Sequence, residues 1–226
     1  SRVAAVRRAP GAASEAPVKT FTLITEVDAR QLERGVTVAL TPGGHVTPLA
    51  QDTLRERRVT VIGAVADPDL LALAPVADVR RVVIGADHTS VALKAHLREA
   101  LRRKGLAVAD VGTDSAEPVD YPDIAARVGR PVAGREADAG IVIDGAGLGS
   151  AIAANKIRGI RAAMCTTRTL ARYAREHNGA NVLALGSTLL SADDALAIVE
   201  VFLATATTEP RYLLRLAKLQ RLEGRD

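Results

Sequence analysis

The chain has 226 residues, of which 48% are hydrophobic and 25% charged, and its formal net charge is +4 at pH 7. This composition is typical of a globular protein and argues against a largely disordered chain. Aromatic residues make up only 2%, with no Trp, and the arginines are interspersed with acids, so a nucleic-acid partner is not expected. The single cysteine, Cys165, leaves no internal disulfide and fits a reducing, cytoplasmic compartment. No apolar run approaches about 20 uncharged residues, so we expect no membrane span.

The first 79 residues divide into three segments. Residues 1–17 are rich in Ala, Arg, Pro, Gly and Ser and predict a flexible tail. Residues 18–63 predict a small α+β unit, with a Gly-rich turn at residues 42–44. Residues 64–79, which contain two prolines, predict a linker or a short helix. In the α+β unit, the strand-like runs are residues 21–25, 36–40 and 59–63, and the helical runs are residues 28–33 and 49–57.

Residues 80–226 alternate between apolar runs and helical patterns. Strands that alternate with helices predict an α/β domain, with a five-stranded parallel sheet and helices on both faces. We expect a last helix at about residues 210–222. The five strands are expected at residues 82–85, 107–111, 139–144, 160–164 and 182–186, and the helices between and after them at residues 90–104, 122–133, 149–156, 167–176 and 192–204.

Polar residues follow the expected strands at the edge where such sheets bind ligands, beyond their carboxyl ends. Asp87 and His88 follow the first strand, and the loop after the second strand reaches Tyr121. Residues 144–149, DGAGLG, follow the third strand, and glycines at alternate positions let backbone N–H groups face a phosphate or an oxyanion. A dinucleotide-binding site is disfavoured, because it would place the glycines after the first strand.

Five motifs together resemble the type B ribose-5-phosphate isomerase and galactose-6-phosphate isomerase family in order and spacing. They are GADHTSVALK, VDYPD, GIVIDGAGLGSAIAANKIRGIRAA, REHNGANVLALGS and a closing R-x-x-x-R, and the resemblance covers about residues 80–222. It implies a Rossmann-like domain that binds a phosphorylated sugar. It also implies a homodimer or a dimer of dimers, with sites built across the subunit interface. The implied reaction interconverts ribose 5-phosphate and ribulose 5-phosphate through a cis-enediolate, without a metal ion or other cofactor.

The resemblance implies a role for each matching residue. Asp144 stands at the position of the catalytic base, His177 opens the sugar ring, and the loop with Gly145, Gly147 and Gly149 holds the oxyanion. Arginines four residues apart on one helical face can bind the same phosphate. For Asn155 a structural role, closing the helix after the glycine loop, is the alternative. The implied substrate-binding residues are Asp87, His88, Tyr121, Ser150, Asn155, Asn178, Arg211 and Arg215.

The base position departs from the family pattern. Many members have Cys where this chain has Asp144, and a subgroup instead uses Glu at the position of Ser150. The stretch IVIDGAGLGS resembles the A subunit of galactose-6-phosphate isomerase, which works with a Cys-bearing B subunit. A carboxylate can take a proton from the carbon beside a carbonyl, so we expect Asp144 to serve as the base, with a purely structural helix N-cap as the alternative.

Two other readings of the function stay open. In the first, the substrate is another aldose phosphate, such as a hexose 6-phosphate. In the second, the chain is a non-catalytic sugar-phosphate-binding or scaffold subunit that needs a Cys-bearing partner. Cys165 lies outside the base position and is expected to be a small buried hydrophobe. No role is expected for His45 or His96, and no spacing of His, Asp and Glu predicts a metal site.

The N-terminal unit carries a second, shorter resemblance. Residues 47–56, TPLAQDTLRE, follow the Gly-rich turn and resemble a segment of bacterial microcompartment proteins, notably of ethanolamine and propanediol utilisation. This implies an enzyme enclosed in a microcompartment, with shell or cargo proteins as partners and the unit serving assembly or targeting. The alternative is a small dimerisation or packing domain, and no residue in the unit is expected to be catalytic.

Overall fold

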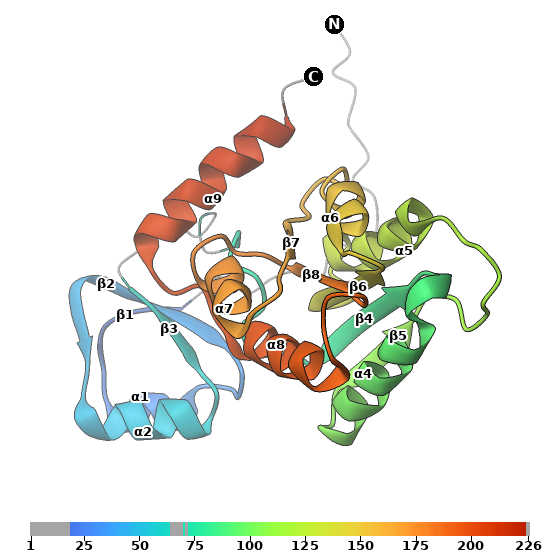
Figure 1. Cartoon of the computed structure of the whole chain (residues 1–226). Coiled ribbons are helices and arrows are strands. Elements are labelled where there is room, and N and C mark those ends of the chain that lie inside the picture. The colour runs from blue at the N-terminus through green and yellow to red at the C-terminus, as the bar shows by residue number, and fades with distance from the viewer. Residues whose placement is uncertain (1–18, 64–69, 71, 225–226) are drawn as a thin grey trace, which may run out of the picture.

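A computed structural model describes residues 19–63, 70 and 72–224. The expected N-terminal tail and part of the expected linker lie outside these residues. The described chain forms two parallel sheets, of three and five strands, each accompanied by helices (Figure 1). None of the helices in the described ranges is both long and apolar enough to cross a membrane.

The five-stranded sheet confirms the predicted α/β architecture. Its strands follow the order β5-β4-β6-β8-β7, and every pairing is parallel. Continuous runs of Val, Ile and Leu form the central strands, because these strands are buried on both faces. The strands are β4 (Arg81–Ala86), β5 (Ala107–Asp110), β6 (Ala139–Asp144), β7 (Ala162–Met164) and β8 (Val182–Gly186).

Helices cover both faces of this sheet, each face over its own apolar core. One core is built on α4, α7 and α8, and includes Leu97, Ala171 and Phe202. The other is built on α5 and α6, and includes Val128 and Ala154. The helix bounds are α4 (Val91–Arg103), α5 (Tyr121–Ala133), α6 (Leu148–Ala154), α7 (Arg168–Glu176) and α8 (Ala192–Ala204), and a short 3-10 helix, η1 (His88–Ser90), precedes α4.

The N-terminal unit also alternates strands and helices, and its three strands pair in parallel in the order β1-β2-β3. Helices α1 and α2 pack on one face, where Ile24, Val38 and Leu54 are buried. The Gly-rich turn lies inside β2, and the register between β1 and β2 shifts near it, between Phe21 and Leu23. The unit contains β1 (Thr20–Ile24), α1 (Glu26–Gln31), β2 (Thr37–Val46), α2 (Pro48–Glu56) and β3 (Thr60–Ile62).

Local hydrogen bonds explain where the two N-terminal helices begin. Thr25 accepts from the N–H of Asp28 and Asp28 accepts from the N–H of Thr25, which is a capping box. The side chain of Thr47 accepts from the N–H of Ala50, and Pro48 occupies the first helical position. The TPLA segment therefore has a structural function as a helix start.

The last helix, α9 (Pro210–Glu223), joins the two units. Leu213 and Leu216 are buried against Ala39 and Ile62, on the face of the three-stranded sheet that α1 and α2 leave open. Figure 1 shows α9 beside β2 and β3, away from the centre of the larger sheet. The N-terminal sheet thus lies between two layers of helix.

Candidate active site

The sheet brings the predicted residues at its carboxyl edge together. Strands β4 and β6 are parallel neighbours, with Ala86 opposite Ile143, so the residues that follow them are adjacent. The N–H of Asp87 donates to the carbonyl of Ile143 at 3.2 Å. Asp87 and Asp144 are each only 6% exposed. We call this group the strand-end cluster; it consists of Asp87, His88, Tyr121, Asp144, Gly145, Gly147, Gly149 and Ser150.

The glycine loop folds around the carboxylate of Asp144. Oδ1 accepts from the N–H of Ala146 at 2.8 Å and also from the N–H of Gly147, and Oδ2 accepts from the N–H of Ser150 at 2.8 Å. Three donors stabilise a buried negative charge at this position. N–H groups that we expected to face an oxyanion are therefore directed at Asp144, as the helix-capping alternative requires. Oδ2 accepts only this one bond among the described residues, so it keeps a free lone pair.

Other donors of the same loop have no partner. Among the residues that the structure describes, the N–H groups of Gly145, Leu148 and Gly149 donate to no acceptor. The hydroxyl of Ser150, which is fully buried, also lacks one within that part of the chain. A buried polar atom without a partner, such as Ser150 Oγ, is rare in folded proteins and commonly indicates a functional site. Leu148 is exposed and Gly145 and Gly149 are partly exposed, so their free N–H groups are open to a ligand at the start of the helix. The free donors beside Asp144 are the groups available to an incoming oxyanion.

Two of the glycines are required by their surroundings. Gly147 has φ +76°, and a Cβ there would lie 2.9 Å from the carbonyl carbon of Leu185. A Cβ on Gly149 would lie 2.7 Å from the ring of Tyr121. Tyr121, at the start of α5, therefore lies directly against the glycine loop, in the place expected for a substrate-lining side chain.

His88 is held at this edge by the loop that carries Tyr121. Its Nδ1 accepts from the N–H of Val119 at 3.2 Å. Since Nδ1 is an acceptor, the ring proton is assigned to Nε2, which can donate to a ligand. Asp87 Oδ1 accepts from the N–H and the hydroxyl of Thr89, at 3.0 and 2.6 Å.

Three hydroxyl residues at this edge escaped the sequence analysis. Thr89 Oγ1 lies 3.2 Å from Ser90 Oγ, which donates to Ser187 Oγ at 2.8 Å. The N–H of Ser187 donates to the carbonyl of Asp144 at 2.9 Å. They connect Asp87 with the strand that carries Asp144. Their positions just after β4 and β8 are the signal that could have identified them, because the same rule selected Asp87.

The remaining predicted residues form a second group, the helix-end cluster. It consists of His177, Asn178, Arg211 and Arg215. His177, at the end of α7, stacks on Tyr173 at 4.7 Å and packs against Tyr212 at 4.6 Å between ring centroids. The guanidinium carbons of Arg211 and Arg215 lie 4.8 and 5.6 Å from the centroid of the Tyr212 ring. The two tyrosines were not predicted, although Tyr173 stands four residues before His177, on the same helical face.

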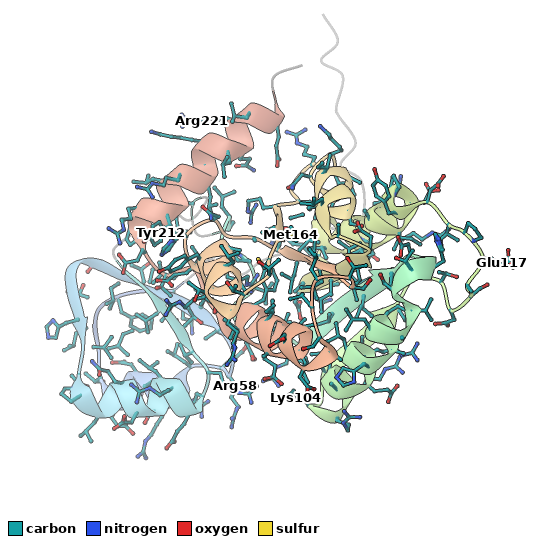
Figure 2. The ribbon with its side chains drawn as sticks, viewed as in Figure 1. Arg58, Lys104, Glu117, Met164, Tyr212 and Arg221 are labelled. Carbon is teal, nitrogen blue, oxygen red and sulfur yellow. The ribbon has the colours of Figure 1, made fainter. Side chains whose placement is uncertain are left out.

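One chain does not bring the two clusters together. His177 and Asn178 precede β8, whereas Asp144 pairs with Gly186 at the far end of that strand. The five residues of β8 span roughly 15 Å at about 3.3 Å each. Figure 2 shows Tyr212 and Glu117, which lies in the loop before Tyr121, on opposite sides of the molecule. The clusters therefore lie at opposite edges of the sheet.

Two further expectations concern single side chains. The amide of Asn155 donates to the carbonyls of Ala151 and Ala162 and accepts from the N–H of Ala162, all at 2.8–2.9 Å. This arrangement joins α6 to β7 and favours the structural alternative for Asn155 over a substrate contact. Cys165 is 1% exposed, and burial raises the pKa of its thiol to about 11. Within the described ranges, no three His, Cys, Asp or Glu side chains are arranged to hold a metal ion.

Comparisons with known proteins identify the family of residues 82–219 and its fold. The model of a family described as Ribose/Galactose Isomerase matches residues 82–219. Ribose-5-phosphate isomerase B of Escherichia coli is 39% identical over 146 residues, which are 65% of this chain and 98% of that protein. The structure of ribose-5-phosphate isomerase B from Clostridium thermocellum aligns with a TM-score of 0.62 at 45% identity, covering 63% of this chain and 97% of that one. The enzyme from Mycoplasma genitalium, solved with bound ribulose 5-phosphate, aligns with a TM-score of 0.62 at 35% identity, covering 65% of this chain and 97% of that one.

Proposed function

The chain belongs to the ribose/galactose isomerase family of sugar-phosphate isomerases, and we propose that it interconverts ribose 5-phosphate and ribulose 5-phosphate. The observation that carries this proposal is the identity of 35–45% with ribose-5-phosphate isomerases B, which extends over nearly their whole length. The strand-end cluster supplies the matching chemistry, because it places a buried carboxylate beside free N–H donors.

In the proposed mechanism, Asp144 moves the proton between the two carbons. Its free Oδ2 lone pair takes the proton from C2 of the open-chain aldose, and the electron pair moves through C1 to the carbonyl oxygen. The N–H groups of Leu148 and Gly149 stabilise the cis-enediolate oxygen. Asp144 then returns the proton to C1 while the hydroxyl proton on O2 passes to O1, so that the C2 carbonyl and the C1 hydroxyl of the ketose form together. The scheme needs no metal ion, since the N–H donors take the place of a Lewis acid.

The helix-end cluster supplies the remaining roles in this proposal. His177 moves a proton between the ring oxygens to open the sugar, Asn178 orients it, and Arg211 with Arg215 binds the phosphate. His88 donates to the same phosphate from the other cluster. Because the clusters of one chain lie at opposite edges of the sheet, we propose that a second copy of the chain completes each site.

Exposed apolar side chains near both clusters support such an assembly. Leu148 and Ile152 on α6 are 59% and 64% exposed, and Leu170 and Tyr173 on α7 are 46% and 41% exposed. Large apolar side chains gathered on one face commonly mark a protein interface. We propose a homodimer, or a dimer of dimers, in which α6 of one chain approaches α7 of its partner.

The experiment that tests the function compares two aspartates at the two ends of β6. We expect Asp144→Asn to lower kcat for ribose 5-phosphate by about 10²-fold or more, because general-base catalysis contributes that much. Asp138 is similarly buried, at 7% exposed, and accepts from the N–H groups of Arg80 and Arg81. Asp138→Asn is therefore the matched control and should keep kcat within about threefold. Full activity of Asp144→Asn would sink the assignment of the base.

One observation favours a second candidate function. Three N–H donors already engage the carboxylate of Asp144, which suits a structural cap in a non-catalytic subunit. In that case the purified wild-type chain binds ribose 5-phosphate without converting it, and activity appears only with a Cys-bearing partner. Turnover of hexose 6-phosphates, measured in the same assay, tests the other substrate class. Association with a bacterial microcompartment stays a prediction from the TPLA segment.

A further inference from the structure

The N-terminal unit has no counterpart in the relatives described above. The Escherichia coli enzyme is aligned over 98% of its length, yet the alignment covers 65% of this chain, and the family match begins at residue 82. We propose that the N-terminal sheet positions α9, and through it Arg211 and Arg215, for phosphate binding. The proposal rests on the proposed function only in assigning the phosphate to these arginines.

The contact between the sheet and α9 is a closed apolar core. Ala39 of β2 and Ile62 of β3 are 0% and 1% exposed, and they pack with Leu213 and Leu216 of α9, at 0% and 2%. Close packing of this kind transmits displacement, because a well-filled core has few alternative arrangements. A change in the sheet surface therefore shifts or loosens the helix.

The arginines stand on the same turns of α9 as the two leucines. Arg211 and Arg215 are exposed, while Leu213 and Leu216 are buried. In a helix, residues four apart share one face, so the two arginine side chains project from the same face of α9. The packing of the two buried leucines fixes the direction in which that face points. Any rotation of α9 on the sheet moves both guanidinium groups together.

Leu216 also links the N-terminal sheet to the rest of the helix-end cluster. A Cβ on Gly179 would lie 2.6 Å from Leu216 Cδ1, so this leucine packs directly on the residue after Asn178. Tyr212, one turn earlier on α9, packs against His177. The face of the N-terminal sheet that holds α9 in place therefore also sets the position of α9 relative to His177 and Asn178.

Two arginines, the buried Arg175 and the partly buried Arg161, attach the chain between the units to the same segment. Arg161 donates to the carbonyls of Leu73 at 2.9 Å and Gly179 at 2.7 Å. Arg175 donates to the carbonyls of Val76 at 2.7 Å and Ala180 at 2.9 Å. The two arginine side chains therefore bridge the described part of the expected linker to the two residues that directly follow Asn178.

A matched pair of variants tests the proposal. Ile62 faces α9, whereas Ile24 is equally buried on the opposite face of the same sheet, against α1 and α2. We expect Ile62→Ala to raise KM for ribose 5-phosphate by roughly tenfold, the effect of a weakened charge-assisted contact, with kcat within about twofold. Ile24→Ala should leave KM near the wild-type value.

Binding of inorganic phosphate, measured by calorimetry, makes the test independent of turnover. The dissociation constant should rise for Ile62→Ala in parallel with KM and stay unchanged for Ile24→Ala. If the wild type binds phosphate but does not isomerise ribose 5-phosphate, the proposed function fails, and a weakened Ile62→Ala still supports the positioning role. Unchanged phosphate binding in Ile62→Ala overturns that role, whatever the activity.

A conservative pair separates positioning from a general loss of folding. If both alanine variants weaken phosphate binding, Ile62→Val and Ile24→Val decide, because removing one methylene leaves the unit folded. Hydrogen exchange at the amides of α9 should then increase for Ile62→Val alone, with a smaller rise in the phosphate dissociation constant. Equal effects of the two valine variants contradict the proposal.

Discussion

Strand β6 begins and ends beside a buried aspartate, and the two carboxylates have different partners. Asp138 precedes the strand and binds the guanidinium of Arg81 at 2.7 Å as well as two N–H groups. Asp144 ends the strand and is bonded by N–H groups alone. Of the two, Asp144 is the one that lies in the glycine loop beside its free donors, which is why we propose Asp144 and not Asp138 as the base.

The carboxylate of Asp138 should make the free energy of unfolding depend on pH. Burial opposes its charge, but the Arg81 guanidinium and the N–H groups of Arg80 and Arg81 outweigh burial and hold the pKa below its ordinary value. A depressed folded-state pKa contributes stability above the unfolded pKa of about 3.9, and this stability is lost as pH falls through the folded pKa. We therefore expect the free energy of unfolding to fall between about pH 5 and pH 3, with a smaller fall in Asp138→Asn.

Urea unfolding at pH 7, 5, 4 and 3 measures this dependence. Asp123→Asn, at an exposed position of α5, is the control and should keep the wild-type slope. Asp138→Asn should be less stable than the wild type at pH 7, and the difference should shrink toward pH 3. A constant difference over this range would contradict the assignment.

At the residue scale, the sequence predicts which side chains lie at the strand ends but not how they are bonded. Asp87 and Asp144 were found because parallel strands end at one edge. That the carboxylate of Asp144 takes N–H groups of the glycine loop depends on φ and ψ angles within the turn. The positive φ of Gly147 is one of them, and a glycine in the sequence permits many angles.

The elements themselves were predictable because their apolar periodicity is strong. The bounds predicted for β6, β8 and α8 agree with the structure, and most other elements differ by one or two residues at their ends. The exception is β2, which was predicted to end at residue 40 and continues to Val46 through the expected turn at residues 42–44. The packing partner of α9 was not predictable. Its apolar positions show which face is buried, but they do not show that the N-terminal sheet covers it.

The helix α7 depends on a buried cation. Arg175 is 0% exposed and donates to the carbonyls of Val76, Ala180 and Thr205. Burial, with the nearby charge of Arg161, lowers the pKa of Arg175 to about 10, so it remains charged at neutral pH. We expect Arg175→Lys to lower the free energy of unfolding by about 3 kcal/mol, because one ammonium nitrogen cannot reach the three carbonyls that Nε, Nη1 and Nη2 of the guanidinium contact separately.

Urea unfolding again gives the measurement, and α7 offers a control. Arg172 is exposed on the same helix, and Arg172→Lys should change the free energy of unfolding by less than about 0.5 kcal/mol. A similarly small change in Arg175→Lys would show that the three carbonyl contacts add little.

For the whole molecule, the central result is the separation of the two clusters within one chain. The sequence motifs place all the predicted site residues in one family pattern but carry no information on which chain supplies each of them. The topology decides this, because a strand that follows His177 and ends opposite Asp144 must hold them apart. We therefore propose that a complete site requires two copies, with the strand-end cluster of one and the helix-end cluster of the other.

The most direct test of this account is complementation between two inactive variants. Asp144→Asn damages the strand-end cluster and His177→Asn damages the helix-end cluster, so each homodimer has two damaged sites. Co-expression should give about half mixed dimers, each with one intact site, and hence about a quarter of the wild-type turnover of ribose 5-phosphate. Mixed dimers as inactive as either parent would show that each chain builds its own site, and the account of a shared isomerase site would be wrong.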